Sequence, residues 1–224
     1  GHGHNRRGGG APDILQELLK DVIARDITSR YNVRNQKALK DLAVYLLTNI
    51  GKKFSYNSLK NNFKFASINS VISFMSYFED TYMLFSIPMF DYSLKKSLVN
   101  PKKVYAIDNG FAIKNSNSFF DDRGRLLENM VFLNLRRKYK DIFYFQGNAE
   151  CDFLVKDGLN IIHAFQVCYE VNGDSKEREV SGLLEAMNKF NLMEGTIITF
   201  NQEDEFTIEN RTIKLIPAWK WLLK

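Results

Sequence analysis

The spacing of apolar positions predicts helices in the first third of the chain. From Asp13 to Arg30, apolar residues recur every three or four positions, which is typical of an amphipathic helix that packs on a partner surface. Residues 35–50 repeat this spacing, and Gly51 stands where a helix commonly ends. Two further helical segments are expected at about 55–63 and 67–78.

The next segments predict two strands, Tyr82–Tyr92 and Lys103–Asp108, joined by a connecting loop, Ser93–Lys102. Helix, short helix, helix and then a hairpin is the order of a winged helix-turn-helix, whose third helix enters the major groove of DNA. We therefore predict a winged helix over 35–115, preceded by an amphipathic linker helix over 13–34. The alternative is that the same module only packs against protein.

In the second half of the chain, helical and strand patterns alternate. The predicted helices cover about 121–139 and 175–191, and the predicted strands cover about 142–146, 150–155, 161–170, 195–200, 206–208 and 212–216. This order predicts a mixed sheet flanked by helices over residues 116–224, in a chain of the α/β class (α+β overall). The Gly-rich residues 1–12 are interpreted as a leader or linker.

The composition excludes several classes of protein. The 224 residues include 18 Phe and 10 Tyr, too many aromatic residues for a disordered chain. No stretch approaches the roughly 18 uninterrupted apolar residues of a membrane-spanning helix, so no membrane contact is expected. Two cysteines make no disulfide framework, which favours a reducing compartment and a cytoplasmic location.

The net charge of +5 is concentrated in one part of the chain. Residues 28–78 hold eight basic and one acidic residue, whereas residues 121–224 hold 14 basic and 17 acidic residues. This asymmetry favours a polyanion, double-stranded DNA, as a partner of the first module. The alternative is a solvated basic face without a partner.

Two kinds of DNA contact are predicted for the first module. The third helix offers short polar side chains but no arginine or lysine, so strong base-specific readout is not expected; these side chains are Asn69, Ser70 and Ser73. Phosphate contacts are expected from lysines around that helix and in the hairpin: Lys52, Lys53, Lys60, Lys64, Lys95, Lys96, Lys102 and Lys103.

In the second module, three polar residues stand among apolar neighbours: Glu128 in a helix, and Asp152 and Gln166 in strands. A carboxylate inside a sheet is costly unless it is paired or binds a metal, and neighbouring carboxylates hold Mg²⁺ for phosphoryl chemistry. The alternative is that Asp152 accepts hydrogen bonds at a strand end. His163 falls on the strand face opposite Gln166 and is interpreted as structural.

Several short motifs carry a resemblance to a known group of proteins. They are Gly124-x-Leu126-Leu127-Glu128, Phe143-Tyr144-Phe145, Glu150-x-Asp152-Phe153 and Phe165-Gln166-Val167, with the upstream stretch Lys103–Gly110. Their order and spacing resemble the C-terminal region of prokaryotic AAA-type ATPases, in which a domain of unknown function follows the ATPase module. That domain is similar to the PD-(D/E)xK nuclease fold.

The resemblance implies a nuclease-like site at Glu128, Asp152 and Gln166, which would be both the catalytic residues and the metal ligands. Cys168 stands where that fold has a lysine, and a neutral thiol cannot stabilise developing negative charge. Lys156, on the strand that carries Asp152, is the candidate for a migrated lysine.

Three functions stay open after this comparison. The first is a DNA- or partner-binding C-terminal portion with an inactive nuclease-like domain and no cofactor of its own. The second is a Mg²⁺-dependent DNase, and the third is a purely structural interaction module. No G-x-x-x-x-G-K-[ST] motif occurs, so ATP would bind to an N-terminal ATPase module outside this chain, which would also be a partner and a route to an oligomer.

Overall fold

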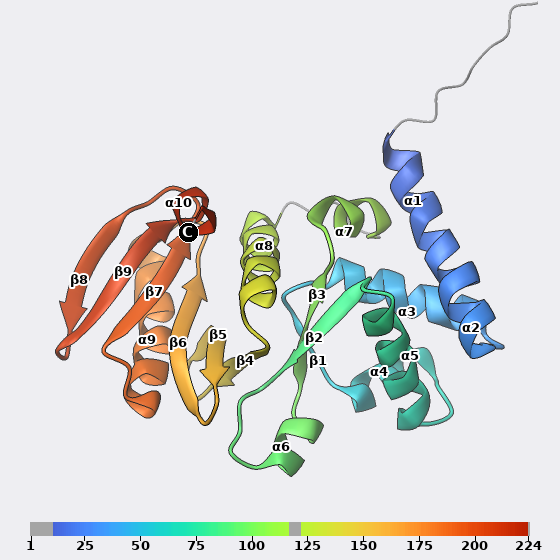
Figure 1. The fold of residues 1–224 in the computed structure, drawn as a ribbon, viewed down its shortest axis with the longest axis horizontal. Coiled ribbons are helices and arrows are strands. Elements are labelled where there is room, and N and C mark those ends of the chain that lie inside the picture. The colour runs from blue at the N-terminus through green and yellow to red at the C-terminus, as the bar shows by residue number, and fades with distance from the viewer. Residues whose placement is uncertain (1–10, 117–121, 224) are drawn as a thin grey trace, which may run out of the picture.

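The computed structural model describes residues 11–116 and 122–223 (Figure 1). The chain starts with a long helical stretch of three segments, α1 (Ala11–Asp21), the π-helical η1 (Val22–Thr28) and α2 (Ser29–Tyr31). The helix predicted from its apolar spacing is therefore confirmed, and Ile23 and Ile27 are its buried positions in η1. Residues 1–10 of the expected leader lie outside the described residues.

Three further helices begin where a polar side chain caps them. These are α3 (Gln36–Thr48), α4 (Tyr56–Phe63) and α5 (Ile68–Asp80). Asn35, Ser55 and Ser67 each accept a hydrogen bond from a backbone N–H in the first turn, which satisfies a donor that the helix itself leaves free.

A three-stranded antiparallel sheet follows these helices in the order β1-β3-β2. Its strands are β1 (Lys53–Phe54), β2 (Leu84–Pro88) and β3 (Lys102–Ala106), and α7 (Asn109–Asn115) comes next. The prediction of a loop between the two long strands is wrong, because α6 (Leu94–Val99) lies in it. The Ser93 hydroxyl accepts a hydrogen bond from the backbone of Lys96 and so starts this short helix.

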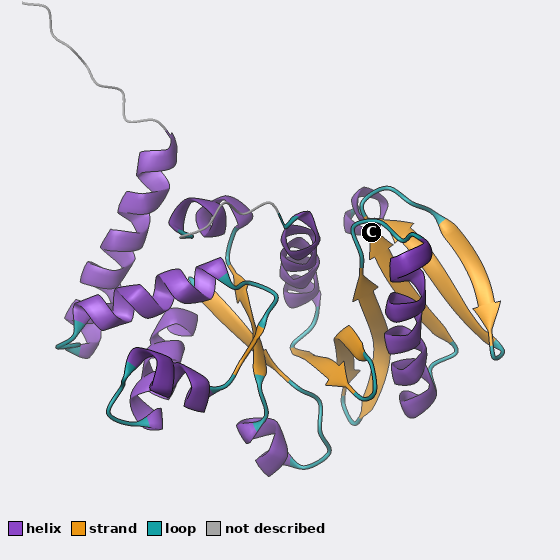
Figure 2. Ribbon diagram, turned by 180° about the vertical axis from the view of Figure 1, so that it is seen from behind, coloured by secondary structure: helices purple, strands orange, loops and turns teal. Residues whose placement is uncertain are grey.

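The C-terminal half forms the predicted mixed sheet. After α8 (Arg123–Lys138), its six strands lie in the order β4-β5-β6-β7-β9-β8; β6, β7 and β9 are parallel and the other pairs are antiparallel. The strands are β4 (Asp141–Gln146), β5 (Glu150–Asp157), β6 (Asn160–Val167), β7 (Glu194–Thr199), β8 (Asp204–Ile208) and β9 (Arg211–Pro217). Helix α9 (Gly173–Phe190) covers one face (Figure 2), and α8 and α10 (Ala218–Leu222) pack on the other.

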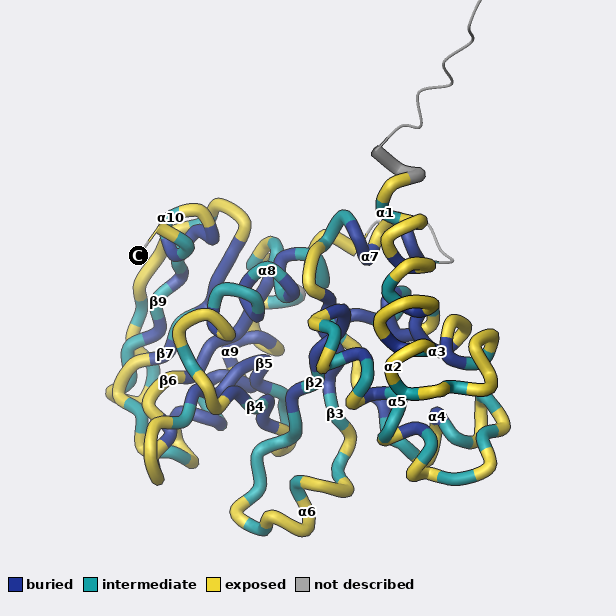
Figure 3. Tube along the Cα trace, turned by 45° about the vertical axis from the view of Figure 1, so that its right-hand side comes forward, coloured by how far each residue is buried: buried dark blue, intermediate teal, exposed yellow. Residues whose placement is uncertain are grey.

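The two halves of the chain, the helical half (residues 11–116) and the C-terminal half (residues 122–223), share β3 as a core strand. Val104 and Ala106 point into the core of the helical half, whereas Tyr105 belongs to the core built by α8 and β5. The Tyr105 ring stacks on Phe132 of α8, with ring centres 4.3 Å apart. Figure 3 shows the result, since the central strands are mostly buried and the connection that carries α6 is mostly exposed.

A buried amide fixes α8 against the end of β3. Asn129 is fully buried, accepts a hydrogen bond of 2.8 Å from the Ala106 N–H and donates one of 3.1 Å to the Ala106 carbonyl. Its Nδ2 also donates to Asn109 Oδ1 at 2.9 Å. These bonds satisfy backbone groups that would otherwise be buried without a partner.

Cys151 and Cys168 are both buried and both free. Across residues 11–116 and 122–223, no helix combines the length and the apolar character needed to cross a lipid bilayer.

The contact between α9 and β5 depends on Gly182. A Cβ atom at this position would lie 1.9 Å from the Glu150 carbonyl oxygen, a backbone atom that cannot rotate away. We expect Gly182→Ala to lower the free energy of unfolding by about 1–3 kcal/mol, as overpacking usually does. Urea unfolding followed by circular dichroism measures this change.

Gly173→Ala is the matched control, because nothing lies within 4 Å of a Cβ atom at Gly173 in the first turn of the same helix. Its stability should stay within about 0.5 kcal/mol of wild type. Equal stabilities of the two variants would contradict the proposed close contact.

Candidate functional site

The predicted carboxylates converge on a buried lysine. Lys103 of β3 is 2% exposed, and its Nζ lies 2.6 Å from Glu150 Oε1, 2.8 Å from Asp152 Oδ1 and 3.0 Å from Glu128 Oε1. Glu128 comes from α8, and the other two carboxylates come from β5. We call these four side chains the Lys103 cluster.

Two further side chains connect the cluster to the three-stranded sheet. Tyr105, two residues along β3 and on the same face as Lys103, donates a hydrogen bond of 2.7 Å from its hydroxyl to Glu128 Oε1. Lys53 of β1 binds the second oxygen of Glu150 at 2.7 Å. The cluster therefore takes cations from the helical half and anions from the C-terminal half.

Burial and charge set the ionisation of this cluster. Burial alone would lower the pKa of Lys103, but Asp152 and Glu128 raise it well above its ordinary value, so the ammonium stays charged. Burial raises the pKa of Glu128 to about 7, against the opposing charge of Lys103. Burial would also raise the pKa of Glu150, which the two lysines nevertheless hold below its ordinary value.

Asp152 and Gln166 are brought together, but their side chains already bind Lys103, Glu179 and backbone N–H groups. Asp152 Oδ2 accepts a hydrogen bond of 2.9 Å from the Val167 N–H. The Gln166 carbonyl oxygen accepts one of 3.1 Å from the Asp152 N–H, and its amide nitrogen donates one of 2.6 Å to Glu179 Oε2. The atom of Gln166 that would bind a metal is therefore already in use.

These residues do not fit a magnesium site in this arrangement. Mg²⁺ needs an octahedral shell of oxygen ligands, several of them water. The Lys103 ammonium contacts three carboxylates at once. Within the two described ranges, no group of three or more His, Cys, Asp or Glu side chains is placed so that it could hold a metal ion.

A cavity of about 570 Å³ opens beside the cluster. It is lined by residues of α8, of the β4–β5 turn, of β5 and β6, and of α9, including Glu128, Asp152, Gln166, Arg125 and Arg178. Gly51, with φ +74°, leaves room for the Glu128 carboxylate, since a Cβ atom there would lie 3.2 Å from its Oε2.

Lys156 does not take the role of a migrated lysine. It pairs with Asp141 and Ile161 near the other end of β5, beyond an irregularity in the β5–β6 register. It is not among the residues that line the 570 Å³ cavity. The lysine that contacts Asp152 is Lys103, which comes from β3.

The expectation that Lys103 contacts phosphate is wrong for this structure, because its ammonium is buried within the cluster. Lys53 is tied to Glu150, and Lys102 is half-buried with its Nζ 5.8 Å from the centre of the Tyr56 ring. Packing against the C-terminal half thus removes β3 from the surface.

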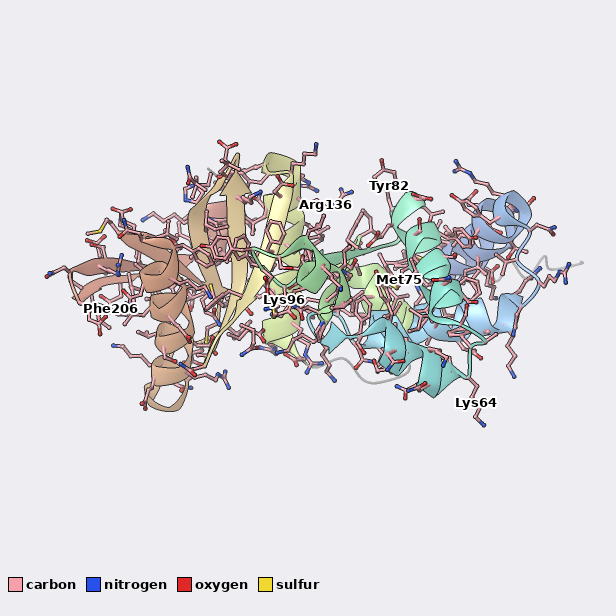
Figure 4. The ribbon with its side chains drawn as sticks, turned by 90° about the horizontal axis from the view of Figure 1, so that it is seen from below. Lys64, Met75, Tyr82, Lys96, Arg136 and Phe206 are labelled. Atoms are coloured by element: carbon pink, nitrogen blue, oxygen red, sulfur yellow. The ribbon has the colours of Figure 1, made fainter. Side chains whose placement is uncertain are left out.

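The other predicted DNA-contacting lysines lie nearer to solvent. Lys60 is half-buried, and the remaining ones are exposed: Lys52, Lys64, Lys95 and Lys96. Figure 4 shows the Lys64 side chain extending away from the body of the protein. On α5, Asn69 is exposed, Ser73 is half-buried, and the Ser70 hydroxyl lies 3.0 Å from that of Ser67.

Sequence reasoning did not assign Lys103, Tyr105, Glu150 or Glu179 to the carboxylate site. The signal for Lys103 and Tyr105 was their alternation with Val104 and Ala106, which puts two polar groups on one face of an apolar strand. Glu150 shares a strand face with Asp152 by the same rule. No local signal links Lys103 to Asp152, because 49 residues separate them.

The comparisons with known proteins give a family and two relatives. A domain of unknown function, DUF8612, matches residues 5–119, just over half of the chain. The chain is 34% identical to the uncharacterized protein MJ1544 of Methanocaldococcus jannaschii and 24% identical to an uncharacterized protein of Haemophilus influenzae.

Each alignment covers 94% of this chain, and it covers 50% of the archaeal and 52% of the bacterial protein. The chain thus spans about half the length of the curated relatives it matches. No solved structure matches.

Loss of the buried cation should be costly. In Lys103→Met, three carboxylates with little exposure would repel each other without a counter-charge, and we expect a loss of about 3–5 kcal/mol in the free energy of unfolding. Lys53→Met is the matched control, since the Lys53 side chain is 41% exposed and its pair with Glu150 should be worth about 1 kcal/mol or less. Urea unfolding compares the two, and similar losses would refute the central role of Lys103.

The raised pKa of Glu128 predicts a pH dependence of stability. The folded protein binds this proton more tightly than the unfolded chain, so the stabilisation is complete below the ordinary value of 4.5 and is lost as the pH rises through about 7. Glu128→Gln cannot ionise. Its stability relative to wild type should therefore rise between about pH 5 and pH 8. Urea unfolding at several pH values tests this, and a constant difference would exclude the titration of Glu128.

Proposed function

The chain belongs to the DUF8612 family of unknown function, and from this premise we propose that it is a DNA-binding portion of a longer prokaryotic AAA-type ATPase, with a nuclease-like domain that does not cleave. The observation that carries the second part is the Lys103 ammonium paired with three carboxylates. The first part is supported by three lysines of the helical half that reach solvent, Lys52, Lys60 and Lys64, which we call its basic surface.

The cluster is unsuited to metal-assisted hydrolysis for an electrostatic reason. Such chemistry needs carboxylates that are free to bind a metal and a cation that is free to stabilise the charge of the transition state. Lys103 contacts the carboxylates from inside the protein, offsets part of their negative charge and is itself held by them. Cys168 stands where the PD-(D/E)xK fold has a lysine. Burial raises the pKa of its thiol, so it adds no charge.

The helical half supports a winged-helix role. Helices α3, α4 and α5 precede the antiparallel pair of β2 and β3, and β1 pairs with β3. In this proposal α5 faces the DNA groove, while Lys52, Lys60 and Lys64 contact phosphates. The hairpin strands are buried, so α6 with Lys95 and Lys96 would be the part of the wing that reaches DNA.

The longer protein is part of the proposal because the relatives are about twice as long as this chain. The resemblance of the motifs to AAA-type ATPases puts the nucleotide site in the other half of such a protein. That ATPase module would also be a binding partner of this chain, and the protein would form oligomers through it.

Cleavage assays test the inactive nuclease-like domain. We expect no cleavage of linear or supercoiled DNA by the wild-type chain with Mg²⁺ or Mn²⁺, measured by gel electrophoresis over several hours. Asp152→Ala is the matched control for contaminating nucleases. Cleavage that disappears in Asp152→Ala would overturn the proposal and establish the alternative, a metal-dependent DNase.

The salt dependence of binding tests the basic surface. If Lys52, Lys60 and Lys64 contact phosphates of duplex DNA, changing all three to Ala should reduce the slope of log affinity against log salt by about 0.9 per lost contact. Fluorescence anisotropy with a labelled duplex measures the slope. Lys189→Ala, on the remote helix α9, should leave it unchanged. Absence of salt-dependent binding by the wild type would favour a purely structural module.

A further inference from the structure

A second cavity, of about 520 Å³, lies on the face of the six-stranded sheet opposite α9. Its floor is formed by β6, β7 and β9, and its sides are the end of α8 and the helix α10. In Figure 1 this face of β7 and β9 is turned toward the viewer, with α9 behind it and no described helix in front. The pocket thus leaves part of the sheet open to solvent.

Four aromatic rings form a continuous row in this pocket. The ring centres of Tyr139 and His163 are 5.9 Å apart, those of His163 and Phe165 are 5.7 Å apart, and those of Phe165 and Trp221 are 5.7 Å apart. Phe165 and Trp221 are buried at 8% and 9% exposure, whereas His163 is exposed. Two buried rings thus pack against the exposed His163, and neighbouring rings in the row meet at angles of 46–70°.

Polar groups with unused bonding capacity stand around this row. The Lys138 ammonium lies 5.7 Å from the centre of the Trp221 ring and forms no ion pair with any described residue. The described part of the chain also gives no hydrogen-bond partner to the His163 side chain. Burial lowers the pKa of His163, so its neutral ring offers one donor and one acceptor near neutral pH.

Of the basic residues at the end of α8, Lys138 lines the pocket. Helix α8 ends in Arg136, Arg137 and Lys138, and Lys140 follows two residues later. Arg136 stacks on Phe85, 3.8 Å from the ring centre, and both Arg136 and Lys140 line a separate cavity between β2, α8 and β4, whereas Arg137 is exposed. On the other side of the pocket, Lys214 is paired with Glu194 at 2.8 Å and so adds no free charge.

We propose that this pocket binds an unpaired base of single-stranded nucleic acid. The base stacks on the exposed His163 ring, and an adjoining phosphate pairs with Lys138. An exposed aromatic ring next to a cation is the kind of site on which single-stranded nucleic acids bind with little sequence preference. An aliphatic ligand would leave the polar groups of Lys138, His163 and Thr196 without partners.

This site is separate from the surface proposed for duplex DNA. Its residues come from α8, α10 and the six-stranded sheet, whereas Lys52, Lys60 and Lys64 belong to the helical half. Either proposal can therefore fail while the other holds.

Fluorescence anisotropy with labelled oligo(dT) and oligo(U) at low ionic strength tests the site. We expect the full chain to bind one or both oligonucleotides. His163→Ala should weaken that binding by between about 5-fold and about 100-fold, which is the loss of affinity expected when one stacked base loses its aromatic partner. His163→Phe keeps a flat ring and should retain binding within about 3-fold. Comparing the two oligonucleotides shows whether DNA or RNA is preferred.

A second measurement distinguishes binding at the pocket from an indirect effect of the His163 substitution. In a Trp219→Phe background, Trp221 is the remaining tryptophan of the two in the chain, and oligonucleotide should change its fluorescence. Lys189→Ala, on α9 at the opposite face of the sheet, is the matched control and should leave single-strand binding unchanged. The proposal is overturned if neither oligonucleotide binds, if His163→Ala binds like wild type, if Trp221 does not respond, or if a blunt duplex competes equally well for the pocket.

Discussion

A single buried ammonium group determines how the two halves of this protein fit together. Removing a lysine and three carboxylates from water costs several kcal/mol per ion, and their mutual attraction offsets this only in a favourable geometry. Here the Lys103 Nζ lies within 3.0 Å of an oxygen of each carboxylate, and the Tyr105 hydroxyl and Lys53 satisfy further oxygen atoms. Because the cation belongs to β3 and the anions to α8 and β5, neither half can satisfy these charges alone.

The same geometry changes the chemistry of the carboxylates. Glu128 and Asp152 both lie beside Lys103, and they accept hydrogen bonds from its ammonium and from a backbone N–H. Gln166 turns its carbonyl oxygen to the Asp152 backbone and its amide to Glu179. A site whose donors and acceptors are satisfied internally is suited to holding a structure together. Polar side chains that are open to solvent lie elsewhere in the described residues, among them Lys138 and His163 at the open face of the sheet and Lys52 and Lys64 in the helical half.

The accuracy of the sequence predictions follows the range of the interactions concerned. Helices capped by Asn35, Ser55 and Ser67 were found because the cap and the apolar spacing lie within a few residues. The short helix α6 was missed because one serine cap starts it and its apolar residues are exposed; Leu94, Leu98 and Val99 are at least 60% exposed. Lys103 was assigned to DNA because a lysine in a predicted hairpin is usually at the surface, and the contact that buries it joins distant parts of the chain.

The sequence alone determined the class of fold, the order of most helices and strands (β1, α6 and α7 excepted), and the concentration of positive charge in residues 28–78. It also singled out Glu128, Asp152 and Gln166, because a polar residue in an apolar segment is costly unless something compensates for it. What compensates was decided by the tertiary structure: Lys103 for the carboxylates, and backbone and Glu179 for Gln166. Periodicity reports which face of its own element a residue occupies, whereas the partner of a buried charge depends on which elements pack together.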